Sequence, residues 1–249
     1  VQILCYRRNK MIKNTINEEE AFAINENLDT RVYKFGKAGV RVLVVDNFYQ
    51  NPYLVRQLAL DIPASVNRRI RGGNPALRIN AFYELSGMAP IYNSLAKEFF
   101  PEVMLNWPHD YMQKSFMNAT FMINVMQSED LPPLAPHQDN RSGMNLASTI
   151  YLNDENESAG GTSFYEFGGK HFYTDDVVNN DFNVTMDVEG KIPVTSYITD
   201  SSHDWEMIGM IPMSFNRMIL YNQAVLHTAY VKPGTFVNNN YRMNQQFFI

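Results

Sequence analysis

The feature that most constrains the fold of this chain is a series of short apolar segments that begins near residue 115. Each segment is rich in Val, Ile, Phe, Tyr or Thr, and turn-forming residues separate it from the next. Many short strands at such spacing are typical of an all-β sandwich or barrel. The segments cover residues 119–127, 146–153, 162–167, 193–199, 206–213, 217–221, 226–231 and 241–249.

The residues before this series show a different pattern. A helix is expected to begin at Pro52, because Asn51 can cap it and an apolar stripe with helical spacing follows. A second helix is expected over residues 89–100, ended by Pro101, and a strand over residues 41–45 precedes both helices. These patterns predict a chain that combines helices with a larger β unit.

We therefore expect one domain over residues 1–249, of the mainly β class with flanking helices (α+β). Residues 1–114 would form a helix-bearing N-terminal layer, and residues 115–249 would form the β core. At 249 residues, a sandwich or barrel of this size can remain a single domain.

The composition excludes several classes of protein. The 21 Lys and Arg against 26 Asp and Glu give a net charge of −5, which argues against a nucleic acid partner. No apolar run approaches the ~20 residues of a membrane span, so no membrane partner is expected. The single cysteine, Cys5, excludes an internal disulfide framework and a zinc site of several thiolates. We expect a protein of a reducing compartment, the cytoplasm.

The histidines carry the first chemical signal. His137 and Asp139 follow a proline-rich segment, and side chains at positions i and i+2 of an extended segment point to the same side. An imidazole and a carboxylate can therefore reach one point in space. His227, inside a β-rich stretch, can add a second imidazole. Two His and one carboxylate on one face of a metal form the ligand set of non-haem Fe(II) oxygenases.

A fourth residue extends this pattern. Arg242 lies at the start of the last expected strand, and Asn244, two residues later, would face the same way. A guanidinium can hold a carboxylate through two parallel hydrogen bonds. The alternative, an arginine in a surface ion pair, is disfavoured because apolar residues flank this position.

Taken together, these residues resemble the 2-oxoglutarate- and Fe(II)-dependent dioxygenase superfamily. Residues 148–153 with 160–164 (STIYLN and GGTSF) are similar to a passage of its prolyl-4-hydroxylase-like branch. Residues 215–221 (FNRMILY) are similar to the strand before the distal histidine in an uncharacterised bacterial and phage-type group of the superfamily. The resemblance covers about residues 115–249.

The resemblance implies a double-stranded β-helix, the cupin-like jelly-roll, with the metal at its mouth. His137, Asp139 and His227 would bind Fe(II), and Arg242 would bind the distal carboxylate of the cosubstrate 2-oxoglutarate. Tyr151 is either a second contact to the cosubstrate or a core tyrosine. The implied reaction uses O2 to hydroxylate a C–H bond of a small molecule or peptidyl side chain, releasing succinate and CO2.

Two departures narrow the expected chemistry. Collagen-type prolyl hydroxylases usually carry a Lys where this chain has Arg242, which argues against a collagen-like substrate. Relatives that halogenate lack the carboxylate ligand, so Asp139 argues against halogenation. The substrate and the oligomeric state are not defined by these residues, and desaturation or cyclisation remains open beside hydroxylation. The loop at 68–71 either meets an anionic substrate or is solvated.

Two other functions compete with this hypothesis. A non-catalytic jelly-roll module would retain metal or ligand binding without turnover. A cupin-type metalloenzyme would use the metal without 2-oxoglutarate, and would not need Arg242.

Overall fold

The elements of the fold follow the expected series of strands. The structure, a computed structural model, describes residues 16–61, 77–82, 85–105, 107–108, 120–125, 134–140, 145–167, 197–202, 204–236 and 241–249. Its strands are β1 (Asp29–Phe35), β2 (Val40–Asp46), β3 (Leu77–Phe82), β4 (Thr120–Val125), β5 (Leu146–Tyr151), β6 (Gly161–Phe167), β7 (Trp205–Pro212), β8 (Met218–Asn222), β9 (His227–Tyr230) and β10 (Asn244–Phe248). Its helices are α1 (Glu18–Ala21), α2 (Pro52–Asp61), α3 (Ala89–Phe99) and α4 (Pro101–Met104), with 3-10 turns η1 (Ser86–Met88) and η2 (Glu155–Glu157).

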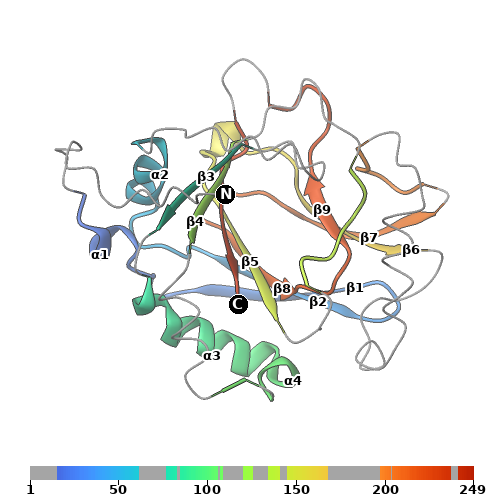
Figure 1. The fold of residues 1–249 in the computed structure, drawn as a ribbon, viewed down its shortest axis with the longest axis horizontal. Helices are drawn as coiled ribbons and strands as arrows, with labels where there is room; N and C mark the ends of the chain where they lie inside the picture. Colours follow the sequence, from blue (N-terminus) through green and yellow to red (C-terminus); the bar gives the residue numbers. More distant parts are fainter. Residues whose placement is uncertain are drawn as a thin grey trace, which may run out of the picture.

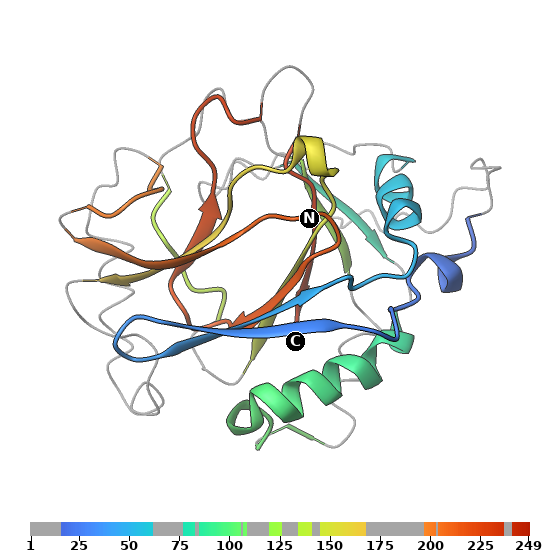
Figure 2. The ribbon, with the colours of Figure 1, turned by 180° about the vertical axis from the view of Figure 1, so that it is seen from behind.

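These strands form two antiparallel sheets. The larger has seven strands in the order β1-β2-β8-β5-β10-β4-β3, and the smaller has three in the order β7-β6-β9. In Figure 1, α3 lies along one side of the seven-stranded sheet, and the three-stranded sheet lies on the opposite side; Figure 2 shows the same arrangement from behind. The prediction of a mainly β fold with flanking helices is confirmed.

The alternation of side chains along the strands gives the large sheet two different faces. One face, which we call the helix-covered face, packs against α2 and α3 through Val55, Ala59, Tyr92 and Leu95. The other, the inner face, packs against the three-stranded sheet through residues such as Phe164 and Ile211. From the large sheet, Leu43, Val45, Leu146, Ile150, Met218, Leu220 and Phe247 belong to the helix-covered face, and Val42, Val44, Ala147, Tyr151, Ile219 and Tyr221 to the inner face.

The N-terminal part of the chain contains more β structure than the sequence predicted. Only the strand at 41–45 was expected there, yet β1, β2 and β3 all belong to the seven-stranded sheet. β1 escaped prediction because it is an edge strand whose residues are almost all exposed, so it has no alternating burial pattern. The division of the chain into an N-terminal layer (1–114) and a β core (115–249) remains a prediction.

The predicted helices are confirmed with one adjustment. α3 ends at Phe99, as Pro101 implied, but Pro101 also begins α4, where it occupies the first turn. Proline is compatible with that position because its missing N–H would have no partner inside the helix.

Two other expectations can be compared with the structure. Most of the strand expected at 193–199 lies outside the described residues, and Tyr197 forms an isolated bridge with Leu134. Among the helices that the structure describes, none combines the length and apolarity needed to cross a bilayer.

Candidate metal and carboxylate site

The first part of the site is a short extended segment that pairs with the first residue of β9 and with the turn before it. The N–H of His137 donates to the carbonyl of His227 over 2.9 Å, and the N–H of His227 donates back over 3.0 Å. The N–H of Asp139 donates to the carbonyl of Gln223 over 3.0 Å. These backbone bonds hold a loop and a strand, far apart in sequence, in a fixed relation.

Three side chains converge at this junction. The ligand atoms of His137, Asp139 and His227 all lie within 4.8 Å of one another. The Nε2 atom of His227 is 3.2 Å from Oδ2 of Asp139, and the Nε2 atom of His137 is 3.7 Å from Oδ1. Within the part of the chain that the structure describes, no other group of three or more His, Cys, Asp or Glu side chains converges in this way.

The ring of His227 is oriented for binding a cation through Nε2. Its Nδ1 lies 2.8 Å from the carbonyl of Val225, and because a carbonyl only accepts, Nδ1 must carry the proton. In the neutral ring, Nε2 then presents a lone pair to the Asp139 carboxylate. Burial lowers the pKa of His227, but the Asp139 carboxylate and the Val225 carbonyl outweigh this effect and raise it above its ordinary value. The position between the imidazole and the carboxylate therefore favours a proton or a metal cation.

Arg242 supplies the second part of the site. Its side chain is only 3% exposed. Nη1 donates to Oδ1 of Asn244 over 3.0 Å, and Nη2 donates to the carbonyl of Gly161 over 3.2 Å. Neither acceptor carries a charge, and among the described residues the guanidinium has no ion-pair partner and its Nε no hydrogen-bond partner. A buried cation without a carboxylate is costly, so the position favours an anionic ligand.

Two tyrosines connect these parts across the inner face. The ring of Tyr151 lies 5.6 Å below the guanidinium carbon of Arg242, and its hydroxyl is 2.7 Å from Oγ1 of Thr162. The ring of Tyr221 is 4.9 Å from that of His227. Burial, followed by the negative charge of Asp139, raises the pKa of Tyr221, whereas the charge of Arg242 acts in the opposite direction.

The sequence-predicted residues thus gather in one region. His137, Asp139 and His227 converge. Arg242, Asn244 and Tyr151 form a second cluster, in which Arg242 bonds Gly161 of β6, three positions from the residue that pairs with His227. Tyr151 is fully buried, in agreement with a core role, and its contact with Arg242 also leaves a cosubstrate role open. Residues 68–71, and the other histidines, His109, His171 and His203, lie outside the described residues.

Sequence reasoning missed Tyr221 and the Gly161 carbonyl. Tyr221 could have been found from its strand. Its side chain points to the face opposite that of Leu220, and it lies shortly before His227. The carbonyl carries no residue-specific signal, but Gly161 and Gly160 do: a Cβ at either position would clash with a backbone carbonyl, of Ile211 or Tyr230 respectively. Glycine at both positions is needed for this close backbone packing.

Comparison with known proteins adds a family and several distant structures. A family described as "Family of unknown function (DUF6445)" matches residues 26–243. No curated protein is similar enough to this chain to indicate a relationship.

Three solved structures illustrate the distant similarity. HygX from Streptomyces hygroscopicus, with nickel and 2-oxoglutarate bound, is 13% identical with a TM-score of 0.44, covering 83% of this chain and 81% of that one. SnoK, a non-haem α-ketoglutarate-dependent carbocyclase from nogalamycin biosynthesis, is 13% identical with a TM-score of 0.43, covering 83% and 78%. An N-substituted L-amino acid dioxygenase from Burkholderia ambifaria is 13% identical with a TM-score of 0.38, covering 89% and 95%. Because these TM-scores are below 0.5, we argue function from the side chains of this chain.

Proposed function

The chain belongs to a family of unknown function, DUF6445, and we propose that it is an Fe(II)- and 2-oxoglutarate-dependent oxygenase. It would hydroxylate a C–H bond of a small molecule or a peptidyl side chain, using O2 and releasing succinate and CO2. One observation carries the proposal: a donor group of His137, Asp139 and His227 and a buried Arg242, which has no carboxylate partner among the described residues, contact the same strand β6. Arg242 bonds Gly161, three positions from Phe164, which pairs with His227.

The three donors fit Fe(II). Two imidazoles and one carboxylate on one side of an ion leave positions open opposite them, which is the ligand arrangement of non-haem Fe(II) oxygenases. When bound, the metal and 2-oxoglutarate supply the oxidising chemistry of the reaction. The chain's own contribution begins with His227, whose Nδ1–H bond to Val225 fixes the ring with Nε2 toward Asp139, where it would be available to hold the ion. Asp139 supplies a negative charge that offsets part of the metal's charge.

Arg242 fits the distal carboxylate of 2-oxoglutarate. On β6, Phe164 pairs with His227, whereas the carbonyl of Gly161 accepts from Arg242. These two strand positions are separated by three residues, or roughly 10 Å. A five-carbon dicarboxylate that contacts the metal through its keto acid end can extend along this direction. Asn244, whose Nδ2 has no partner among the described residues, could donate to the same carboxylate.

We further propose that the two sheets are the walls of a double-stranded β-helix. The backbone bonds between His137 and His227 support this, because they connect the metal-binding loop to the smaller sheet beside the inner face. Placement in the prolyl-4-hydroxylase-like branch rests on the sequence passages at 148–153 and 160–164. The absence of nucleic acid and membrane partners, and the cytoplasmic location, rest on composition and stay predictions.

The proposal is tested by anaerobic titration of Fe(II) into the apo protein, with and without 2-oxoglutarate. We expect a weak visible charge-transfer band that needs both ligands. The band should disappear in His137→Ala and persist in Asp200→Asn, which changes an exposed carboxylate outside the site. Failure of the wild-type protein to bind Fe(II) would contradict the assignment of the metal ligands.

Arg242→Ala separates the proposal from its two competitors. For a 2-oxoglutarate oxygenase, the variant should retain metal but lose affinity for 2-oxoglutarate. A cupin-type metalloenzyme would be indifferent to the substitution. A non-catalytic module would bind metal and never decarboxylate 2-oxoglutarate with any substrate tested.

A further inference from the structure

The backbone on both sides of Arg242 is held by a single side chain. The Nδ2 of Asn153 donates to the carbonyl of Tyr241 over 2.5 Å, and its Oδ1 accepts from the N–H of Met243 over 2.6 Å. Asn153 is completely buried. One carboxamide thus contacts the residues immediately before and after Arg242.

This contact continues the pairing of β10 with β5 beyond the last residues of the two strands. β10 begins only at Asn244, and its partner β5 ends at Tyr151. One more backbone bond follows, from the N–H of Leu152 to the carbonyl of Met243 over 3.0 Å. Beyond it, on the side that faces β5, the Asn153 side chain contacts the backbone next to Arg242 and offers one donor and one acceptor in the manner of a strand neighbour. Arg242 itself also forms a β-bridge.

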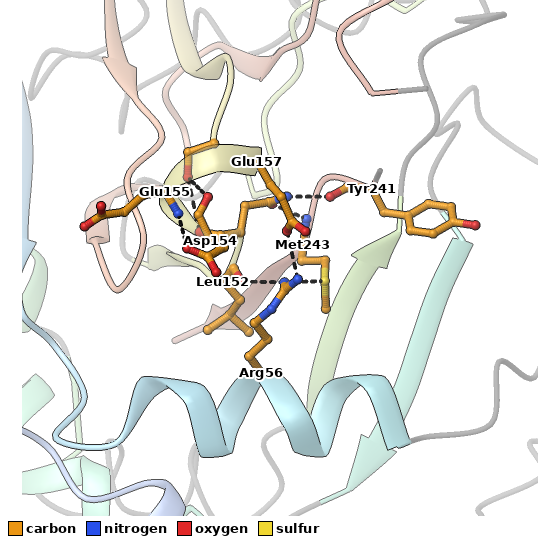
Figure 3. A network of polar contacts seen from close by, with 9 residues as sticks. Arg56, Leu152, Asp154, Glu155, Glu157, Tyr241 and Met243 are labelled. Carbon is orange, nitrogen blue, oxygen red and sulfur yellow. Dashed lines mark hydrogen bonds and ion pairs between the residues drawn. The ribbon is translucent and has the colours of Figure 1, made fainter. Parts of the chain in front are cut away.

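Arg56 of α2 reinforces the same region (Figure 3). Its Nη1 donates to the carbonyl of Leu152 over 2.9 Å and lies 3.0 Å from Sδ of Met243. Its Nη2 forms an ion pair of 2.8 Å with Glu157 of η2. Arg56 therefore joins the helix to the residues beside Asn153 and Arg242.

The segment that follows Asn153 also reaches the guanidinium itself. The hydroxyl of Ser158 donates to the carbonyls of Asn153 and Asp154 over 3.2 and 3.0 Å, which closes the turn. The chain then continues to Gly161, whose carbonyl accepts from Arg242. One stretch of chain thus fixes both the backbone and the charged end of Arg242.

We propose that Asn153, supported by Arg56, is a positioning residue that sets the guanidinium of Arg242 for the distal carboxylate of the cosubstrate. This inference rests on the proposed function, because it assumes that Arg242 binds 2-oxoglutarate. Asn153 touches neither the cosubstrate nor the metal; it acts through the backbone of its neighbours. Small displacements matter here, since a two-pronged contact with a carboxylate requires a defined guanidinium geometry.

The test compares two ligands on the Mn(II)-loaded protein by calorimetry. 2-Oxoglutarate has both the keto acid end and the distal carboxylate, whereas 2-oxopentanoate has the same chain length and lacks that carboxylate. We expect Asn153→Ala to weaken 2-oxoglutarate binding by about tenfold, the effect of losing roughly one well-placed hydrogen bond. Binding of 2-oxopentanoate and of Mn(II) should stay within about twofold of wild type, the reproducibility we allow for near-neutral changes.

Asn216 offers a matched control. Its carboxamide makes the same two-point contact with the backbone, accepting from the N–H of Tyr49 over 2.8 Å and donating to its carbonyl over 2.9 Å. Its φ is 62°, so glycine is the suitable replacement. Asn216→Gly should lower the melting temperature without changing the preference for 2-oxoglutarate over 2-oxopentanoate.

Arg56→Ala provides a second, milder variant, because its side chain is not fully buried. We expect a loss of about threefold in 2-oxoglutarate affinity, as for a partly exposed ionic contact. Equal weakening of both keto acids, or an unchanged preference in Asn153→Ala, would overturn the inference. If the wild-type protein itself shows no metal-dependent 2-oxoglutarate binding, the proposed function fails instead, so the two failures can be distinguished.

Discussion

The two faces of the seven-stranded sheet are built by the same strands but have opposite characters. The helix-covered face is a closed apolar core, with residues such as Leu43, Leu220 and Phe247 packed against α2 and α3. The inner face has apolar residues too, yet it borders His227 of the candidate triad and the buried Arg242. Neighbouring residues of one strand therefore contribute to a closed core on one side and border the candidate site on the other.

This difference indicates where the free energy of folding comes from. Burial on the helix-covered face is favourable, because most of its side chains have no polar atoms and Tyr49 and Tyr92 find hydrogen-bond partners. Beside the inner face, His227 and Arg242 are buried polar groups, and burial of such groups is costly without partners. We expect a substitution on the helix-covered face to lower stability and leave ligand binding unchanged. A substitution of Arg242 should raise stability and weaken ligand binding.

The largest effect on stability should come from the helix-covered face. Leu220→Ala removes a fully buried side chain of β8 and should lower the free energy of unfolding by about 2–5 kcal/mol. Denaturant unfolding measures this change, with Leu60→Ala as the control, since Leu60 is 55% exposed. Metal affinity of the folded variant should be unchanged; a large loss would mean that the two faces are not separable.

A smaller effect of opposite sign is expected on the inner face. Arg242→Met replaces a buried guanidinium with an apolar side chain of similar length and should raise the stability of the ligand-free protein by about 1–4 kcal/mol. The same change should abolish metal-dependent 2-oxoglutarate binding. A destabilised Arg242→Met protein would indicate that the bonds to Asn244 and Gly161 already compensate for burial of the charge.

The smallest expected effect on stability concerns a buried tyrosine and depends on pH. Tyr92, on the helix-covered face, is 2.8 Å from the hydroxyl of Ser148, and burial raises its pKa above the ordinary value of 10. Tyr92→Phe should cost about 0.5–1.5 kcal/mol at neutral pH, where the lost hydrogen bond is the main change.

The cost of Tyr92→Phe should shrink in alkaline solution. The folded state keeps Tyr92 neutral while the unfolded chain ionises it, so this stabilising contribution is complete below pH ~10 and decreases as the pH rises further. Above pH ~10 the wild-type protein therefore loses this contribution to stability, whereas Tyr92→Phe has no hydroxyl to ionise and does not. Unfolding curves at neutral and alkaline pH test the sign; a constant difference would contradict it.

The parts of the molecule that could be predicted from sequence are those with local signals. β5 and β8 are buried on both faces and carry mostly apolar residues, so they were visible as short runs. His137 and Asp139 are two residues apart, so their common direction followed from strand geometry. His227 and Arg242 required a family pattern, because nothing local indicates which distant side chain completes a site.

The remaining parts depend on tertiary contacts that leave little trace in the sequence. β1 is an exposed edge strand, so its residues are not selected for an alternating pattern. Asn153 was seen as part of a motif, but its hydrogen bonds connect it to residues 88 and 90 positions away. Arg56 resembled an ordinary charged residue of an amphipathic helix until its contacts with Leu152 and Met243 were located.

If the proposed metal binds, the pairing of His137 with His227 would also link the lifetime of the protein to metal supply. The ligands come from segments joined only in the folded chain, so the unfolded chain has no ready site, and a metal bound there stabilises the native state alone. Cells short of that metal would hold a population that opens more often at this junction. Proteases act on opened states, and the abundance of the protein would then follow metal availability even at constant synthesis.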